Sequence, residues 1–355
     1  MKLNREALVA ALEQVKPALA SSGSIPELKH VWLDGKYLYA YNGALGIRVD
    51  WATELQPCGL LGSVLLGLLQ STSAKEIEVT QEAKTQLDLK MGRASATVPL
   101  MAIDHNPWPF PAKVTAGPVG VVTFALTEAF IEGLKQVRII KAADPKMVEH
   151  YGVILFPSKD ALTLYATDSK SLAEVPVQGK FAKELVKAVL PFGFVNQLLA
   201  LKVGAKVSFT QDAIIAEAED VQVCSNLLDT ADVHDLPKLV TTTIGKDDTA
   251  ATPLPKEFSE ALDRALILAG GDLDKAFVTL AVTKKELSLS GKLANGVLQE
   301  KFTLGSPGSG SITVGLEQIK GLARDAEDFA IVQKALLLFG KNDALYLIAA
   351  HEGGK

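Results

Sequence analysis

Side chains that could carry out acid–base, nucleophilic or metal chemistry are present, but no catalytic pattern groups them. The five histidines show no metal-ligand spacing of the HExxH kind: His30, His105, His150, His234 and His351. No serine lies in the GxSxG pattern that places a nucleophile between a strand and a helix. Cys58 and Cys224 are far apart and form no CxxC pair, which is typical of inert thiols in a reducing compartment. The sequence therefore favours a protein that is not an enzyme and has no metal or cofactor.

Two loops offer the enzyme alternative little support. The segment "GSPGSGS" (Gly305–Ser311) could cradle a phosphate, but it lacks the following lysine and helix start of a P-loop. We therefore predict a hairpin loop there. The acidic segment "DLDK" (Asp272–Lys275) is predicted to be a solvated turn.

Composition and charge limit the remaining classes. The chain has 355 residues, 48% hydrophobic and 22% charged, which is typical of a globular protein with two or three domains. Its longest uncharged apolar stretch, residues 59–70, covers about half of the roughly 20 residues that a membrane span needs. We predict a buried helix there, no membrane association and, from the amphipathic start of the chain, a cytoplasmic location. The net charge of −5 argues against a uniformly basic surface but allows a basic patch.

One kind of strand recurs at a spacing of about one domain. "LTLYATD" (residues 162–168) follows "YLYAYN" (residues 37–42) by 126 positions when Tyr39 is aligned with Tyr165, and "LSLSG" (residues 287–291) follows 125 positions later. Each strand is preceded by an amphipathic helix, predicted at residues 4–16, 127–141 and 255–269. Pro17 should end or kink the first helix near Lys16.

A second apolar helix and further strands follow each of these segments. The second helices are predicted around residues 60–70, 192–202 and 316–324, and short alternating strands come after each one. Each unit therefore has the order helix, strands, helix, strands. We predict an α+β fold of three repeated domains at residues 1–117, 118–245 and 246–355, divided near Pro and Gly clusters.

In the order and spacing of these segments, the whole chain resembles the bacterial sliding clamp, the β subunit of the replicative DNA polymerase. The matching segments are "RASATVPLMAIDHNPWPFP", "YGVILFPSKDALTLYATDSKSLA", "DRALILAGGDLDKAFVTLAVTKKELSLSG" and "ALYLIAAHE". The resemblance implies a head-to-tail homodimeric ring of DNA-clamp architecture, whose helices line a channel for double-stranded DNA. It also implies partners that dock through short peptide motifs, namely the replicative polymerase and the clamp loader.

Such a ring needs only a diffuse positive lining that contacts phosphates without reading the base sequence. The predicted channel residues are Arg5, Lys16, Lys135, Arg138, Lys141, Lys202, Arg264, Lys320 and Arg324. Each of them is equally compatible with an ordinary solvated helix face. The stretch at 59–70 has no basic residue, and Phe192 and Gly193 stand where the family often has basic side chains, so we expect weaker DNA contact.

Two further surfaces follow from the resemblance. Ile267 and Leu268 fall away from the core stripe of their helix, and the family places its subunit interface there, opposite Trp108 and Phe110. Alternatively, the "WPFP" segment is a loop packed on its own domain.

The family's peptide pocket corresponds here to Thr167, Leu172, Pro237, Leu239, Leu347 and Ala349. The leucines could equally fill a domain core. Ala349, Ala350, His351 and His150 depart from the family's apolar pattern, so we expect a wider or less apolar pocket. Two alternative interpretations stay open. The protein could be a clamp-like decoy or regulator that binds clamp partners without encircling DNA, or an uncharacterised enzyme.

Overall fold

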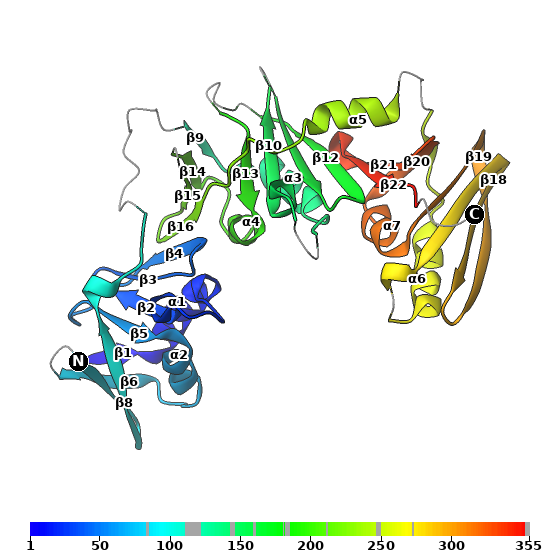
Figure 1. Cartoon of the computed structure of the whole chain (residues 1–355). Helices are drawn as coiled ribbons and strands as arrows, with labels where there is room; N and C mark the ends of the chain where they lie inside the picture. Colours follow the sequence, from blue (N-terminus) through cyan, green and yellow to red (C-terminus); the bar gives the residue numbers. More distant parts are fainter. Residues whose placement is uncertain are drawn as a thin grey trace. The chain divides into compact units, whose positions relative to one another are not determined.

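The computed structural model describes residues 1–82, 85–110, 122–142, 146–158, 161–179, 181, 185–210, 212–245, 250–271 and 273–351. Helices and antiparallel strands alternate along these residues, which confirms the predicted α+β class (Figure 1). The chain forms two compact units, which are described separately. Unit 1 holds residues 1–127 and 193–227, and unit 2 holds residues 128–192 and 228–355.

The division into three domains stays a prediction. Its boundary at residues 117 and 118 lies outside the described residues, and so does residue 246, where the third domain is predicted to begin. Asp272 of the acidic segment is also outside them.

Unit 1 is built on one antiparallel sheet. Its described strands have the order β1-β6-β7-β8-β5-β2-β3-β4-β16-β15-β14-β9. Their bounds are β1 Lys2–Asn4, β2 His30–Leu33, β3 Tyr37–Tyr41, β4 Leu45–Asp50, β5 Cys58–Leu61, β6 Glu76–Glu82, β7 Gln86–Met91, β8 Ala94–Ala102, β9 Val122–Ala125, β14 Lys206–Phe209, β15 Ala213–Glu217 and β16 Val221–Asn226. The helices are α1 Arg5–Val15 and α2 Gly62–Gln70, and α4 Phe192–Leu198 begins at the division between the units.

The helices of unit 1 follow from local sequence. The Asn4 side chain caps α1 by accepting a hydrogen bond from the Ala7 amide at 3.0 Å, and α1 ends before Pro17 as predicted. Helix α2 buries Leu65, Leu66 and Leu69, which confirms a buried helix in the uncharged apolar stretch. The first residues of that stretch belong to β5 instead.

Unit 2 has a second sheet, with the order β13-β10-β11-β12-β22-β21-β20-β17, and a separate hairpin of β18 and β19. The strand bounds are β10 Gly152–Pro157, β11 Leu162–Thr167, β12 Ser171–Val177, β13 Ala188–Pro191, β17 Thr252–Pro253, β18 Phe277–Leu293, β19 Gly296–Gly315, β20 Ala326–Val332, β21 Ala335–Gly340 and β22 Leu345–Ala349. The helices are α3 Glu128–Val137, α5 Leu236–Ile244, α6 Phe258–Ala269 and α7 Leu316–Ala323. Phe130, Leu134 and Val137 recur at helical spacing along α3 and are fully buried.

The hairpin corrects one prediction. The segment 305–311 is not the hairpin loop, because it lies inside β19, where the register shifts between Lys284 and Glu286 of β18. Leu293 pairs with Gly296, so the turn is formed by Ala294 and Asn295. An Asn-Gly sequence is a strong local turn signal, whereas small residues such as Gly and Ser tolerate the irregular pairing of a bulge.

Candidate functional sites

The predicted channel residues lie on or beside the helices, but many of them already have partners within the chain. Lys16 pairs with Glu13 at 2.9 Å, and Lys135 pairs with Glu132 at 2.5 Å. Arg5 is partly buried and donates a hydrogen bond to the Leu69 carbonyl at 3.2 Å. Part of the positive charge on these helices is therefore balanced locally.

The basic residues of α6 and α7 are the most strongly paired. Arg264 donates two hydrogen bonds to the Glu300 carboxylate, at 2.6 and 2.7 Å. The Lys320 side chain is buried, and its ammonium group donates to Asp263, which lowers the pKa of that carboxyl group. Arg138, Lys141, Lys202 and Arg324 are exposed. The exposed set is better placed to meet a phosphate backbone than Lys320.

Helix α6 exposes a large apolar side chain away from its core face. Ile267 is 75% exposed and Leu268 partly exposed, while Phe258, Leu262 and Ala265 are fully buried. This confirms that Ile267 points outward, as its helical position predicted. A large exposed aliphatic side chain beside a complete core face is a candidate association surface.

Trp108 and Phe110 pack within their own chain. Phe110 is 7% exposed and lies edge-to-face against Tyr41 and Trp108, with ring centroids 5.6 and 5.5 Å apart. Both rings lie over Gly46 of β4, where an added Cβ would be 2.9 Å from each ring. The structure thus brings these residues to the joint where β4 pairs with β16, and their role in a subunit interface stays a prediction.

The residues of the predicted peptide pocket gather at a second joint, where β12 pairs with β22. Leu172 pairs directly with Leu347 in the register of these strands. Both leucines belong to a buried apolar cluster and are only 5% and 6% exposed. Thr167 is also buried, whereas Ala349 and Leu239 are exposed and Pro237 is partly buried.

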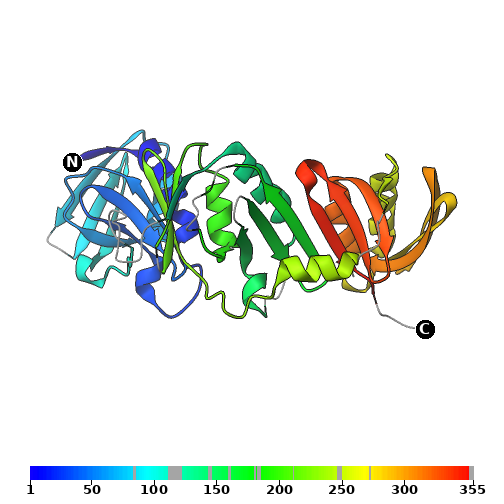
Figure 2. The ribbon, with the colours of Figure 1, turned by 90° about the horizontal axis from the view of Figure 1, so that it is seen from above.

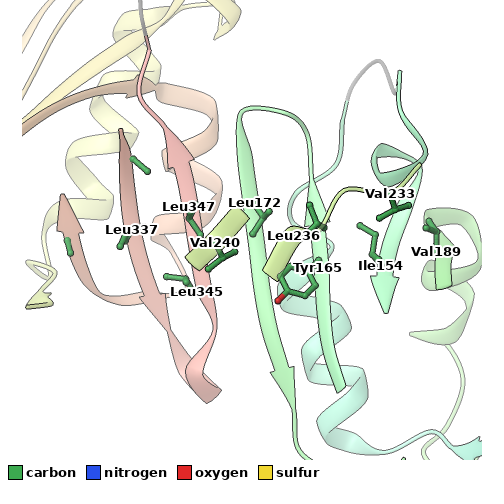
Figure 3. Close-up of a cluster of buried hydrophobic side chains, with 12 residues drawn as sticks. Ile154, Tyr165, Leu172, Val189, Val233, Leu236, Val240, Leu337, Leu345 and Leu347 are labelled. Carbon is green, nitrogen blue, oxygen red and sulfur yellow. The ribbon is translucent and has the colours of Figure 1, made fainter. Parts of the chain in front are cut away.

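Helix α5 supplies the residues that the sequence analysis missed. Leu236 and Val240 extend from α5 into the same cluster, close to Leu172 and Leu347 (Figure 3). The local signals were present: Asp235 caps the helix by accepting from the Lys238 amide, and a proline stands in its first turn. The run of threonines that follows hides the helical pattern, because β-branched residues disfavour helices.

Two hydroxyl groups beside this joint have hydrogen-bond partners within the chain. The Tyr165 hydroxyl donates to Glu174 at 2.7 Å, and burial raises the pKa of Tyr165 well above its ordinary value. The Thr167 hydroxyl donates to the Ser171 carbonyl at 2.9 Å and thereby closes the turn between β11 and β12. These groups hold the strands in place and leave an apolar surface at the joint.

A cavity of about 410 Å³ lies beside the same turn. Its wall mixes cationic and anionic side chains, namely Lys141, Lys146, Lys170, Asp168, Asp274 and Glu317. Neither sign of charge dominates, so the cavity points to no single class of ligand. Within the described ranges, no group of three His, Cys, Asp or Glu residues is placed to hold a metal ion, and no helix is long and apolar enough to cross a bilayer.

The fold places the chain among known structures. The sequence matches no protein-family model and no curated protein. Its structure is similar to a putative DNA polymerase III β subunit from Eubacterium rectale, with a TM-score of 0.83 at 15% identity. DNA polymerase sliding clamps from Pseudomonas aeruginosa (TM-score 0.82, 16% identity) and Bacillus subtilis (TM-score 0.82, 16% identity) are similarly close.

Each of these matches covers 99% of this chain and 99% of the other. The chain therefore has the fold of the bacterial DNA polymerase III β sliding clamp along its full length. This confirms, at the level of the fold, the resemblance that the sequence indicated.

Proposed function

We propose that this protein is a sliding clamp, without catalytic activity of its own, that encircles duplex DNA as a head-to-tail homodimeric ring. It tethers the replicative DNA polymerase and other replication and repair proteins and gives them processivity. The observation that carries this proposal is the fold match to DNA polymerase sliding clamps over 99% of the chain. A cytoplasmic location and attachment by a clamp loader belong to the same proposal.

Dimerisation is supported by surfaces that the chain leaves open. Among the described residues, β18 and β19 pair only with each other, and the Ala94–Pro99 part of β8 pairs only with β7. Open strand edges are sites at which another chain can add to a sheet. Ile267 lies on α6, which packs against this hairpin, so an apolar contact and a strand edge are available in one region.

DNA contact is proposed to be diffuse and independent of base sequence. The supporting feature is the set of exposed basic residues on or beside the helices, among them Arg138, Lys141 and Lys202. Since several other basic residues are paired with carboxylates, we expect weak phosphate contact with a steep dependence on salt. Retention then depends mainly on the closed ring.

The test of the ring combines solution mass with retention on DNA. We expect a dimer by sedimentation, and longer retention on closed circles than on linear duplexes of equal length. Ile267→Asp should give folded monomers, because a carboxylate buried without a partner at an interface costs several kcal/mol, roughly 3–5. Val186→Asp, at another exposed aliphatic residue of unit 2, is the matched control. A wild-type monomer that binds clamp partners but is not retained on circles would favour the decoy reading.

The role of the basic helices can be tested separately. Lys135→Glu combined with Arg138→Glu should shorten retention without unfolding the chain. Lys36→Glu combined with Lys334→Glu changes the net charge equally at exposed positions in the β2–β3 and β20–β21 turns, away from the proposed subunit contact, and should have a smaller effect. Equal effects of the two double variants would remove α3 from the DNA-contacting surface.

A further inference from the structure

The apolar surface at the β12–β22 joint is covered by a segment of the chain itself. Leu236 and Val240 of α5 are 2% and 5% exposed and pack in one cluster with Leu172 and Leu347. Figures 1 and 2 both show α5 lying across the line where β12 meets β22. Any apolar anchor that is to reach Leu172 and Leu347 must therefore compete with these two side chains (Figure 3).

The helix that covers the joint is intrinsically weak. Its last five residues are Val240, three threonines and Ile244, all of them β-branched, so their side chains lose rotamer freedom in a helix. Each threonine hydroxyl donates to the carbonyl four residues earlier, at 2.7 to 2.9 Å, an interaction that slightly destabilises and bends helices. A nine-residue helix of this composition depends on its tertiary contacts.

Each end of α5 is fixed by contacts of its own. Before the helix, Val233 is buried, its carbonyl accepts from Lys187 at 3.3 Å, and His234 Nδ1 lies 2.6 Å from Glu149 Oε1. At the other end, the helix stops at Gly245, whose φ of 78° is a conformation that favours glycine. Ile244, the last residue of α5, packs against the same apolar cluster. Displacement of α5 must therefore break contacts at both ends of the helix.

We propose that α5 is a displaceable cap on the peptide site, and that Leu236 and Val240 occupy the places that a partner's apolar anchors take on binding. This rests on the proposed function, because it concerns regulation of the same partner site. The ligand is a short peptide with two large apolar side chains. The site accepts it only when α5 moves away and takes Pro237 and Leu239 with it, which leaves Thr167, Leu172, Leu347 and Ala349 of the predicted pocket to contact the peptide. The apparent affinity is then lowered in proportion to the fraction of molecules that are open.

The test uses one exposed position on α5. Thr242 is exposed on the helix and outside the buried cluster, so replacing it changes helix stability without changing the site. Thr242→Gly should weaken the cap, and Thr242→Ala should strengthen it. If the open fraction is small, a fluorescent peptide with adjacent Leu and Phe residues should bind the Gly variant about fivefold tighter than the Ala variant.

Two controls accompany the comparison. Lys238→Gln keeps helix propensity at another exposed position and should leave the affinity unchanged. A peptide with both anchors replaced by Ala should not bind any variant. Hydrogen exchange provides an independent test. Peptide binding should speed the exchange of the α5 amides if the helix is displaced, whereas binding beside an undisturbed helix would slow it.

The outcomes separate the two proposals. Equal affinities of the Gly and Ala variants, together with protected α5 amides in the complex, would overturn the cap and keep the peptide site. Absence of specific binding in every variant would overturn the peptide site itself, and the cap with it. The opposite order of affinities, with Ala tighter than Gly, would make α5 part of the binding surface instead of a competitor.

Discussion

The β4–β16 joint and the β12–β22 joint are both antiparallel strand pairs, but different side chains pack over them. We call these side chains the cover of each joint. Tyr39 of β3 and Gly46 of β4 stand 126 positions before Tyr165 of β11 and Leu172 of β12. Gly46 pairs with Cys224 across the first joint, and Leu172 pairs with Leu347 across the second. In each case, two strands that are far apart in the sequence pair antiparallel.

The size of the paired residues determines what can cover each joint. Gly46 leaves room for the large rings of Trp108 and Phe110, which lie directly over it. At the second joint two leucines occupy this space, and the cover consists of the smaller side chains Leu236 and Val240. The first cover is a tightly packed aromatic cluster, and the second is a short helix of weak propensity. This difference teaches that one joint is suited to a permanent contact and the other to an exchangeable one.

The largest expected effect is at the aromatic cover. Phe110→Ala should lower the free energy of unfolding by about 3–5 kcal/mol, because a buried aromatic ring is lost and a cavity remains. Chemical denaturation followed by tryptophan fluorescence measures it. Pro109→Ala, at the exposed neighbouring residue, is the control. A loss below about 1 kcal/mol for Phe110→Ala would mean that this cover is also loosely held.

The corresponding substitution at the β12–β22 joint should lower the free energy of unfolding less and should affect a smaller part of the structure. Leu236→Ala should cost about 2–3 kcal/mol, at the low end for a buried leucine, because α5 can detach without unfolding the sheet. Hydrogen exchange should show faster exchange in α5 and little change in β12 and β22. Equal acceleration throughout these strands would show that α5 is integral to the core.

The close approach at Gly46 can be tested by adding one methyl group. Gly46→Ala should cost about 1–3 kcal/mol, since the new Cβ would lie 2.9 Å from Phe110 and Trp108 and must displace them. Near-ultraviolet circular dichroism should report the shifted rings. Gly67→Ala in α2, where an added Cβ meets nothing within 4 Å, is the matched control. An unchanged aromatic signal would contradict a tightly packed cover.

The smallest expected effect comes from the repeated tyrosines at high pH. Burial raises the pKa of both Tyr39 and Tyr165 above the ordinary value of 10. The folded state therefore keeps these protons while the unfolded state releases them, and stability falls as pH rises above 10. Each tyrosine should contribute about 1.4 kcal/mol of loss per pH unit in this range.

Tyr39→Phe and Tyr165→Phe should each reduce the fall of the free energy of unfolding at alkaline pH. Chemical denaturation at several values between pH 9 and pH 11 measures this fall. At pH 7 the two substitutions should change the free energy of unfolding by different amounts. The Tyr165 hydroxyl donates to Glu174, whereas the Tyr39 hydroxyl accepts from the Asn106 side-chain amide at 2.9 Å. An unchanged pH profile in both variants would place the alkaline sensitivity elsewhere.

The sequence by itself determined the features that depend on near neighbours along the chain. The buried stripe of α3, the Asn4 cap and Pro17 stop of α1, and the outward position of Ile267 follow from helical spacing and backbone chemistry. The repeat of strands likewise predicted the class of fold, because alternation and spacing reflect one building unit. These signals lie within a few turns of helix or within one strand.

Only the tertiary structure decided which side chains meet across long separations. Lys320 looked like an exposed helix cation, yet its pairing with Asp263 of α6 makes it buried. Leu172 and Leu347 became one surface through strand pairing, and α5 covered that surface although its β-branched residues disfavour a helix. Propensity acts locally, whereas burial of apolar area depends on what the rest of the chain brings alongside, and here burial outweighed propensity.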